Sequence, residues 1–346
     1  MTTFRDLGIG RDLPCFIICE IGQAHDGSLG IAHSMIDAAA DAGSNAVKFQ
    51  THIAAEESTY DEQFRVLFSY EDKTRFDYWR RMEFTQLQWE ELAKHAEARG
   101  LVFISSPFSI AAVELLEQIG VKLWKIGSGE IMNTDLLERV LETNLPIIAS
   151  TGLYAWDDIK LFSDRVQKSN VELALLQCTS SYPCSLEEIG LNNMSVIKNR
   201  FGCITGLSDH SGKLSPSLYA IAQGAQVVEV HCTFDRKMFG PDSSSSLTFE
   251  ELSQLAVFRD EFFILRNHPV DKEKSALSRA HTKSLFSRSI ALKNDMCKGE
   301  TLKLEHLSLK KPGSGLKPKD IDALIGKRLK RDVSCLYLLQ EDDLEQ

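Results

Sequence analysis

Residues 123–130 read LWKIGSGE, a short apolar run that contains one lysine and ends in a glycine-rich polar tip. An apolar run, a polar tip and a longer segment of helical periodicity recur in this order along about the first 270 residues. Near-continuous apolar strands that alternate with helices indicate a parallel sheet covered on both faces. Eight such runs predict a closed (β/α)8 TIM barrel of the α/β class; they are residues 16–19, 46–49, 101–104, 123–126, 146–149, 173–177, 203–207 and 227–230.

The segments around these runs predict the domain organisation. Amphipathic helices are expected over residues 31–42, 85–99 and 111–119. An insert at residues 54–82, rich in charged and aromatic side chains, interrupts the repeat and is either a substrate lid or a plain surface excursion. We predict a catalytic barrel at 1–270, a polar linker at 271–285 and a small β-rich module at 286–346.

The composition argues against several classes of protein. Hydrophobic residues make up 43% of the 346 positions and charged residues 25%, which is typical of a soluble globular protein. No stretch approaches the roughly 18 apolar residues of a membrane span, and no signal peptide is recognised, so we expect a cytoplasmic location. The net charge of -10 argues against nucleic acid as a partner. The 8 cysteines include no CxxC pair and are expected to be buried free thiols.

Polar side chains stand at the end of every predicted strand. In a barrel of this kind the carboxyl ends of the strands carry the active site. Lys48 and Lys125 lie within apolar runs, where an unpaired ammonium is costly to bury, so we expect an anionic ligand between them. The alternative for each lysine is an ion pair with a nearby glutamate. Hydroxyl groups for a small, multiply charged acid are expected from Ser106, Ser128, Ser150, Ser180 and Ser208.

Two histidines end adjacent predicted strands. His210 and His231 follow the seventh and eighth runs, so their imidazoles can converge on one point. Two imidazoles beside a carboxylate, from Glu20 or Asp209, suit a transition metal that keeps open positions for water. We therefore predict a divalent metal at His210 and His231. The other histidines are assigned no role, except that His25 stays open.

Short motifs follow one another in a particular order along the chain. They are CEIG (19–22), HDG (25–27), AVKFQ (46–50), SSPF (105–108), KIGSGE (125–130), STG (150–152), CTSSYP (178–183), GLSDH (206–210) and GPD (240–242). Together they resemble the sialic acid (nonulosonic acid) synthase family, which includes N-acetylneuraminate, legionaminate and pseudaminate synthases. The resemblance covers nearly the whole chain, because PGSG (312–315) followed by Gly326 and Lys327 resembles the family's C-terminal antifreeze-like (SAF) domain.

This resemblance implies a reaction. The family's enzymes are carbon–carbon bond-forming transferases of carbohydrate biosynthesis. They condense phosphoenolpyruvate with an N-acetylated hexosamine (N-acetylmannosamine or a 2,4-diacetamido-trideoxy hexose) and water, and they release phosphate and a nine-carbon sialic acid-like 2-keto acid. The resemblance also implies a domain-swapped homodimer, in which the C-terminal domain of one chain covers the active site of the other.

The resemblance also implies roles for individual residues. Glu20, Glu130 and Lys125 are expected to be catalytic, with Glu20 orienting or deprotonating a water at the metal. His210 and His231 would bind Mn²⁺, with Mg²⁺ or Co²⁺ as alternatives. Phosphoenolpyruvate would be held by Lys48, Ser106, Lys125, Ser128, Ser150, Ser180 and Ser208, and the sugar by Gln50, Tyr182, Asp242 and Lys311.

Three positions depart from the family's pattern. Ala24 stands where asparagine often precedes the histidine, Ser180 where asparagine is frequent, and Lys311 where an arginine would reach the N-acetyl group. Lysine keeps the charge there but lacks the bidentate fork of arginine.

Two other functions stay open at this stage, namely a metal-dependent barrel aldolase or hydrolase and a carbohydrate-binding protein. The acceptor also stays open, and the lack of an obvious basic cluster disfavours a sugar 6-phosphate.

Overall fold

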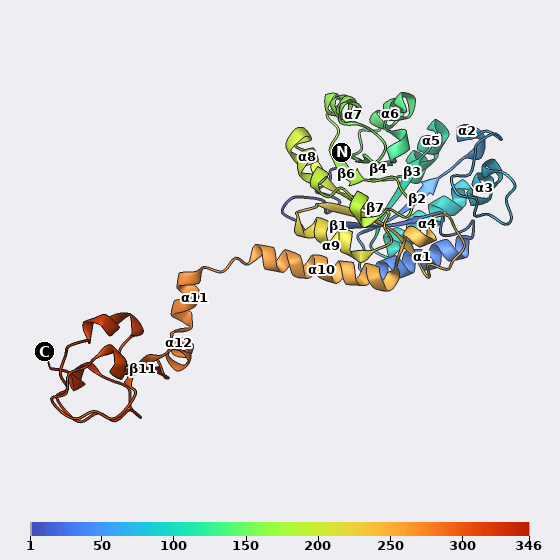
Figure 1. Ribbon diagram of the computed structural model, residues 1–346. Helices are drawn as coiled ribbons and strands as arrows, with labels where there is room; N and C mark the ends of the chain where they lie inside the picture. Colours follow the sequence, from blue (N-terminus) through green and yellow to red (C-terminus); the bar gives the residue numbers. More distant parts are fainter. Residues whose placement is uncertain (1, 346) are drawn as a thin grey trace. The chain divides into compact units, whose positions relative to one another are not determined.

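The computed structural model describes residues 2–345 and divides into two compact units between Asn267 and His268. The first unit is a barrel of parallel strands surrounded by helices (Figure 1). Each predicted apolar run coincides with a strand, so the predicted barrel is confirmed. The strands are β1 (Phe16–Gly22), β2 (Ala46–Thr51), β3 (Val102–Pro107), β4 (Trp124–Ile126), β5 (Ile147–Ser150), β6 (Leu173–Cys178), β7 (Ile204–Asp209) and β8 (Val227–Thr233).

The strands pair in the order β3-β2-β1-β8-β7-β6-β5-β4, and β3 also contacts β4, so the barrel is nearly closed. A short strand, β9 (Leu247–Thr248), pairs with β8 outside this path. The register matters for the site, because Glu20 lies opposite Lys48 on one side and opposite His231 on the other. Three chemically different side chains therefore stand at one level of the barrel.

Helices cover the outside of the barrel, and their ends follow local signals in the sequence. Thr85 caps α4 by accepting a hydrogen bond from the backbone of Gln88, and Gly120 ends α5 with a left-handed φ of 85°. The three helices predicted from periodicity are confirmed. The helices of this unit are α1 (Leu29–Asp41), α2 (Ala54–Glu57), α3 (Arg75–Met82), α4 (Gln86–Ala98), α5 (Ile110–Ile119), α6 (Thr134–Leu141), α7 (Trp156–Lys168), α8 (Asn192–Phe201), α9 (Leu214–Ala222) and α10 (Phe249–Asn267).

The apolar core of the barrel unit has two layers. A large layer fills the space between the strands and the helices, and it includes Ile17, Trp89 and Leu92. A smaller cluster contains Phe16 and Ile18 together with residues from most of the other strands. Because alternate residues of a strand face opposite sides, this second cluster fills the inside of the barrel near the amino ends of its strands.

The insert at 54–82 is a folded excursion with an apolar cluster of its own. It contains α2 and α3, and Tyr78, Trp79 and Met82 of α3 are buried together with Ala54. Thr74 and Asp77 form a capping box that starts α3. The insert therefore has its own apolar cluster and a capped helix.

The second unit has a small core of its own. The predicted linker at 271–285 contains two short helices, α11 (Lys272–Ser278) and α12 (Ala280–Phe286). Beyond them, β10 (Ser289–Leu292) pairs antiparallel with β11 (Leu307–Lys310), and the core includes Leu302, Leu329 and Leu339. All eight cysteines are free; Cys297 is exposed and two others are half-buried, so the expectation of burial is wrong for these three. Among residues 2–345, no helix is long and apolar enough to cross a membrane.

Candidate active site

A cavity of about 520 Å³ opens at the carboxyl ends of the barrel strands. Its lining comes from the strand ends, from the loops that follow them and from the insert. All predicted site residues of the first unit line it: Glu20, Lys48, Gln50, Ser106, Lys125, Ser128, Glu130, Ser150, Ser180, Tyr182, Ser208, His210, His231 and Asp242. Lys311 belongs to the second unit, where its ammonium lies 5.3 Å from the ring centroid of Phe286. Its role in sugar binding stays a prediction.

The floor of the cavity is formed by four charged residues, Glu20, Lys48, Lys125 and Glu229. Their position follows from the two-residue period of the strands. Glu20 comes two positions after Ile18, Lys125 two positions after Leu123, and Glu229 two positions after Val227. Each of these apolar residues belongs to the cluster inside the barrel, so the next side chain on the same face lies one layer higher. The apolar layer therefore places the charged groups at the bottom of the cavity.

Both floor lysines already have carboxylate partners. Lys48 forms an ion pair with Glu20, and its ammonium lies 3.9 Å from Glu229. The ammonium of Lys125 lies 3.3 Å from Glu229. The expectation that these lysines lack a protein partner is thus wrong, and the ion-pair alternative holds. Glu229 was not among the predicted site residues, although its spacing from His231 placed both on one face of the strand.

Burial and charge act against each other on these groups. Burial lowers the pKa of Lys125, and the nearby Glu229 carboxylate offsets this only in part. Glu229 is also buried, but Lys125 and Lys48 outweigh this and lower its pKa to about 2. Burial raises the pKa of Glu20, whereas the carboxylates beside Lys48 raise the pKa of that ammonium against the effect of burial. Because Lys48 and Glu20 are in direct contact, we take the pair as charged, and the four floor charges cancel.

Hydroxyl groups surround the two ammonium groups. Lys48 donates to Ser106 at 3.3 Å, and Lys125 donates to Ser150 at 2.8 Å. Ser208 donates to Glu229 at 3.0 Å. These serines therefore lie within reach of any anion that contacts the lysines.

A close backbone approach brings two further hydroxyls to the cavity. The amide of Gly152 donates to Ser128 at 2.9 Å, and a Cβ atom at position 152 would collide with the hydroxyl of Ser180. A larger residue here would displace the Ser180 hydroxyl, so glycine leaves room for both hydroxyls. The five predicted hydroxyls thus line one cavity with the lysines.

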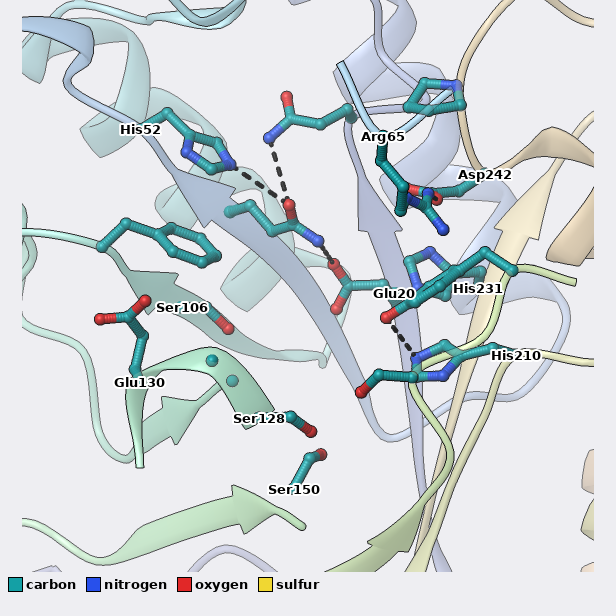
Figure 2. A pocket seen from close by; sticks show the side chains of 18 of the residues that line it. Glu20, His52, Arg65, Ser106, Ser128, Glu130, Ser150, His210, His231 and Asp242 are labelled. Carbon is teal, nitrogen blue, oxygen red and sulfur yellow. Dashed lines mark hydrogen bonds and ion pairs between the residues drawn. The ribbon is translucent and has the colours of Figure 1, made fainter. Parts of the chain in front are cut away.

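The two predicted metal-binding histidines lie side by side. Their ring centroids are 5.3 Å apart (Figure 2). Nδ1 of His210 lies 3.1 Å from the carbonyl oxygen of Thr179 and donates to it, so the lone pair of Nε2 is left for a ligand. Tyr182 donates its hydroxyl to this Nε2 at 3.1 Å, and a metal bound there would take the place of this hydrogen bond. Burial lowers the pKa of His210 to about 3, which keeps the imidazole neutral, as a metal ligand must be.

These histidines fit a metal that is held by two imidazoles. Among residues 2–345, no group of three or more histidine, cysteine, aspartate or glutamate side chains could hold a metal ion. Glu20 lies opposite His231 in the sheet register, whereas Asp209 is absent from the cavity lining and accepts hydrogen bonds from Ser211. Glu20 is therefore the carboxylate beside this pair, and the remaining coordination positions would fall to water or substrate.

His25, which stayed open, lies outside the cavity lining. Its side chain is fully buried, and its ring lies 4.8 Å from that of Phe84. Burial lowers its pKa to about 3. Nδ1 accepts a hydrogen bond from the amide of Gly27 at 3.1 Å. Its contacts are therefore those of a residue that stabilises the loop after β1.

The other predicted polar residues stand higher in the cavity. Gln50 donates to Glu20 at 3.0 Å, and Asp242 accepts from Arg65 at 3.0 Å. Glu130 accepts from Asn133 at 2.8 Å, and its burial raises its pKa. Figure 2 shows Glu130 on the side of the cavity opposite His210 and His231.

Most of the wall that the insert contributes was not predicted from the sequence. Arg65 reaches over the cavity, and its guanidinium lies 4.2 Å from the ring centroid of Tyr182 (Figure 2). His52 directly follows β2 and lines the cavity, although no role was assigned to it. The only signal in the sequence was the density of charged and aromatic residues in the insert. The insert residues on this wall are Glu57, Glu62, Phe64, Arg65, Val66, Phe68, Arg75, Tyr78 and Trp79.

Comparison with known protein families agrees with this geometry. Residues 35–261 match the model of the NeuB family, and residues 287–345 match the SAF domain. The chain belongs to the NeuB family. It is an N-acetylneuraminate synthase-like enzyme with a (β/α)8 barrel and a C-terminal SAF domain, as the motifs predicted.

Related proteins and a solved structure cover most of the chain. It is 32% identical to an N,N'-diacetyllegionaminic acid synthase of Legionella pneumophila, over 97% of this chain and 96% of the relative. It is 31% identical to the human N-acetylneuraminate-9-phosphate synthase, over 97% of this chain and 92% of the relative. The crystal structure of an N-acetylneuraminic acid synthetase from Leptospira borgpetersenii, in complex with citrate, superposes with a TM-score of 0.70. That structure is 30% identical and covers 80% of this chain and 93% of its own.

Proposed function

We propose that this enzyme condenses phosphoenolpyruvate with an N-acetylated hexosamine and water. The products would be a nine-carbon 2-keto acid of the sialic acid type and inorganic phosphate. The main support for this proposal is the cavity floor, where two buried ammonium groups and five hydroxyls lie beneath a more open polar wall. A small polyanion fits the floor, and a sugar fits the wall.

The floor would bind the phosphate and carboxylate groups of phosphoenolpyruvate. Lys125 and Lys48 supply positive charge, and Ser106 and Ser150 already contact them. Hydrogen bonds between charged groups are stronger than neutral ones, particularly where water is excluded. The incoming anion would therefore exchange some contacts of Glu20 and Glu229 for its own.

A divalent cation would balance the charge of this anion. The four floor charges cancel before any ligand binds, so a bound trianion alone would leave the buried site strongly negative. His210 and His231 would hold the ion, with Mn²⁺ as the first candidate and Mg²⁺ or Co²⁺ as alternatives. When bound, the ion would polarise the aldehyde of the open-chain sugar.

The residues of this chain would then organise the remaining steps. C3 of the enol attacks the aldehyde carbon, water adds at C2, and the tetrahedral adduct expels phosphate by cleavage of the C–O bond. Glu20 would accept the proton of the attacking water, because burial raises the pKa of this carboxylate. Lys125 would stabilise the negative charge on the departing phosphate. Holding both reactants in line is worth several powers of ten in rate, roughly 10⁵ or more.

We propose an acceptor without a phosphate group. The wall carries four carboxylates, from Glu57, Glu62, Glu130 and Asp242, against the guanidinium groups of Arg65 and Arg75. Both arginines are already paired, Arg65 with Asp242 and Arg75 with Glu62 at 3.2 Å. A sugar 6-phosphate would meet more negative than positive charge on this wall. A neutral N-acetylmannosamine or 2,4-diacetamido sugar avoids this repulsion.

Phosphate release from phosphoenolpyruvate tests this function. The purified enzyme is assayed with Mn²⁺ against N-acetylmannosamine, its 6-phosphate and the 2,4-diacetamido sugars, with a chelator as control. We expect release that requires both metal and one neutral acceptor, with the nine-carbon product identified by mass spectrometry. Preference for the 6-phosphate would refute the neutral acceptor, and no release with any acceptor would refute the synthase proposal.

The domain-swapped homodimer and the cytoplasmic location stay predictions. Mixing two inactive variants tests the first, one altered at Lys125 in the barrel and the other at Lys311 in the SAF domain. Activity recovered in mixed dimers is expected if the SAF domain serves the partner's barrel. No recovery after subunit exchange would contradict the swap. Cell fractionation tests the location.

A further inference from the structure

The imidazole of His52 lies where the insert meets the barrel. Its side chain is only 4% exposed. The ring lies between those of Trp79 and Phe108, at centroid distances of 3.7 and 4.3 Å and interplanar angles of 16° and 11°. Two aromatic faces thus fix the ring plane, and only the two ring nitrogens are left to form hydrogen bonds.

The contacts of Gln50 show which atoms donate. Nε2 of Gln50 lies 3.0 Å from Oε1 of Glu20 and donates to it, because an ionised carboxylate only accepts. The carbonyl Oε1 of Gln50 therefore faces the other way. It lies 3.3 Å from Nε2 of His52 and 3.4 Å from Nε2 of Gln23. A carbonyl oxygen cannot donate, so Nε2 of His52 carries a proton.

The second ring nitrogen contacts another acceptor. Nδ1 of His52 forms a short hydrogen bond with the carboxylate of Glu57, a side chain that is 8% exposed. A proton must lie between these two atoms as well. The two aromatic faces and this contact fix the ring so that Nε2 points toward Gln50.

We propose that His52, supported by Glu57, is a positioning residue for the acceptor side of the active site. Three hydrogen bonds link Glu57 to His52, His52 to Gln50, and Gln50 to Glu20; Figure 2 shows the part that runs from His52 to Glu20. This chain holds the amide of Gln50 in the one orientation that donates to Glu20. Without it the amide can turn its oxygen toward the carboxylate, where two acceptors repel each other.

The inference rests on the proposed function, in which Gln50 contacts the sugar and Glu20 acts on water. His52 itself contacts no reacting atom in this role. It connects the insert to the floor of the cavity, since Glu57 belongs to α2 and Glu20 to β1. The insert would thereby influence the catalytic carboxylate as well as the shape of the wall.

Kinetics of two variants separate positioning from packing. His52→Phe keeps the stacked ring and removes both nitrogens, whereas His52→Gln places an amide N–H near the position of Nε2. We expect His52→Phe to lower kcat/KM for the acceptor roughly ten- to a hundredfold, with little change in KM for phosphoenolpyruvate. His52→Gln should restore most of this loss. The control is His95→Gln, because His95 is absent from the cavity lining and its Nε2 lies 2.9 Å from the carboxylate of Asp37.

Wild-type constants in His52→Phe would overturn the proposal. Equal losses for both substrates in both variants, together with lower melting temperatures, would also overturn it, because they indicate packing alone.

A ¹⁵N NMR spectrum of histidine-labelled enzyme tests the geometry without any substrate. We expect one imidazole whose Nε2 is protonated and lies in a hydrogen bond, and we expect its signals to vanish in His52→Phe. An unprotonated Nε2 at His52 would overturn the inference, because it could not donate to the carbonyl oxygen of Gln50. If the wild-type enzyme releases no phosphate with any acceptor, the proposed function fails, whereas this spectrum still shows whether Nε2 of His52 carries a proton.

Discussion

The floor and the insert wall of the cavity are built by different means. The floor lysines stand on strands within the barrel ladder, and the side chains of Lys48 and Lys125 are 4% and 3% exposed. The insert's part of the wall comes from residues 54–82, which pack around a separate aromatic cluster, and the side chain of Arg65 is 42% exposed. A rigid, buried layer suits a substrate whose charge must be compensated. A separately packed excursion can change in sequence without disturbing the barrel, which suits the choice of acceptor.

Removing a floor ammonium should have the largest effect. Lys125→Ala is expected to lower kcat/KM for phosphoenolpyruvate about a hundred- to a thousandfold, because the anion loses one of its two ammonium partners and meets the unpaired carboxylate of Glu229. KM for phosphoenolpyruvate should rise far more than KM for the sugar. Steady-state phosphate release measures both constants. The matched control is Lys122→Ala, an exposed lysine three positions earlier.

The reverse ranking of the two Michaelis constants would refute the role of Lys125. It would also contradict the contrast between floor and wall, because the floor would then not be the region that binds the anion. Thermal melting of the variant separates lost binding from lost folding.

Removing one of the two predicted metal-binding histidines should weaken metal binding and leave the fold intact. His231→Ala is expected to weaken Mn²⁺ binding by at least about tenfold, as measured by isothermal titration calorimetry. Metal-dependent activity should fall with it, whereas the melting temperature of the metal-free protein should change little. His281→Ala, at an exposed position in the second unit, is the control. Full activity of His231→Ala in metal-free buffer would contradict the metal assignment.

The metal and phosphoenolpyruvate should bind cooperatively. Because the floor charges cancel without ligands, each ligand should offset the charge that the other brings. We expect Mn²⁺ to tighten phosphoenolpyruvate binding roughly 5- to 150-fold, the usual range of coupling between two sites. Calorimetric titrations with and without chelator measure this factor. Equal affinity in both titrations would show that the floor compensates the anion without a cation.

The same contrast explains what the sequence could predict. The floor residues were predictable, because a strand's two-residue period puts Glu20, Lys48 and Lys125 above apolar residues at strand ends. Their pairing was not predictable, since it depends on the register between strands that are distant in the sequence. Glu20 and Lys48 are 28 positions apart along the chain yet lie opposite each other in the ladder. The expectation that these lysines lack a protein partner was therefore wrong, whereas their binding of an anion stays a prediction.

The wall carried no periodic signal at all. Arg65 and Asp242 lie 177 positions apart, and their contact follows from how the aromatic cluster folds the insert over the barrel. No role could be predicted for His52 from the residues next to it in the sequence. Its position depends on stacking with Trp79 and Phe108, which come from two other elements. Side-chain packing between distant elements is not encoded in any short window of sequence.

The smallest effect is expected at the rim of the wall. Arg65→Ala removes the ion pair with Asp242 and the cation–π contact with Tyr182, each worth about 0.2–1 kcal/mol at a partly exposed site. KM for the acceptor should therefore rise roughly three- to tenfold, while KM for phosphoenolpyruvate stays the same. Arg80→Ala, an exposed arginine on α3, is the matched control. A selective rise in KM for phosphoenolpyruvate would show that the wall contributes to binding of the anion. The assignment of phosphoenolpyruvate to the floor and of the acceptor to the wall would then be wrong.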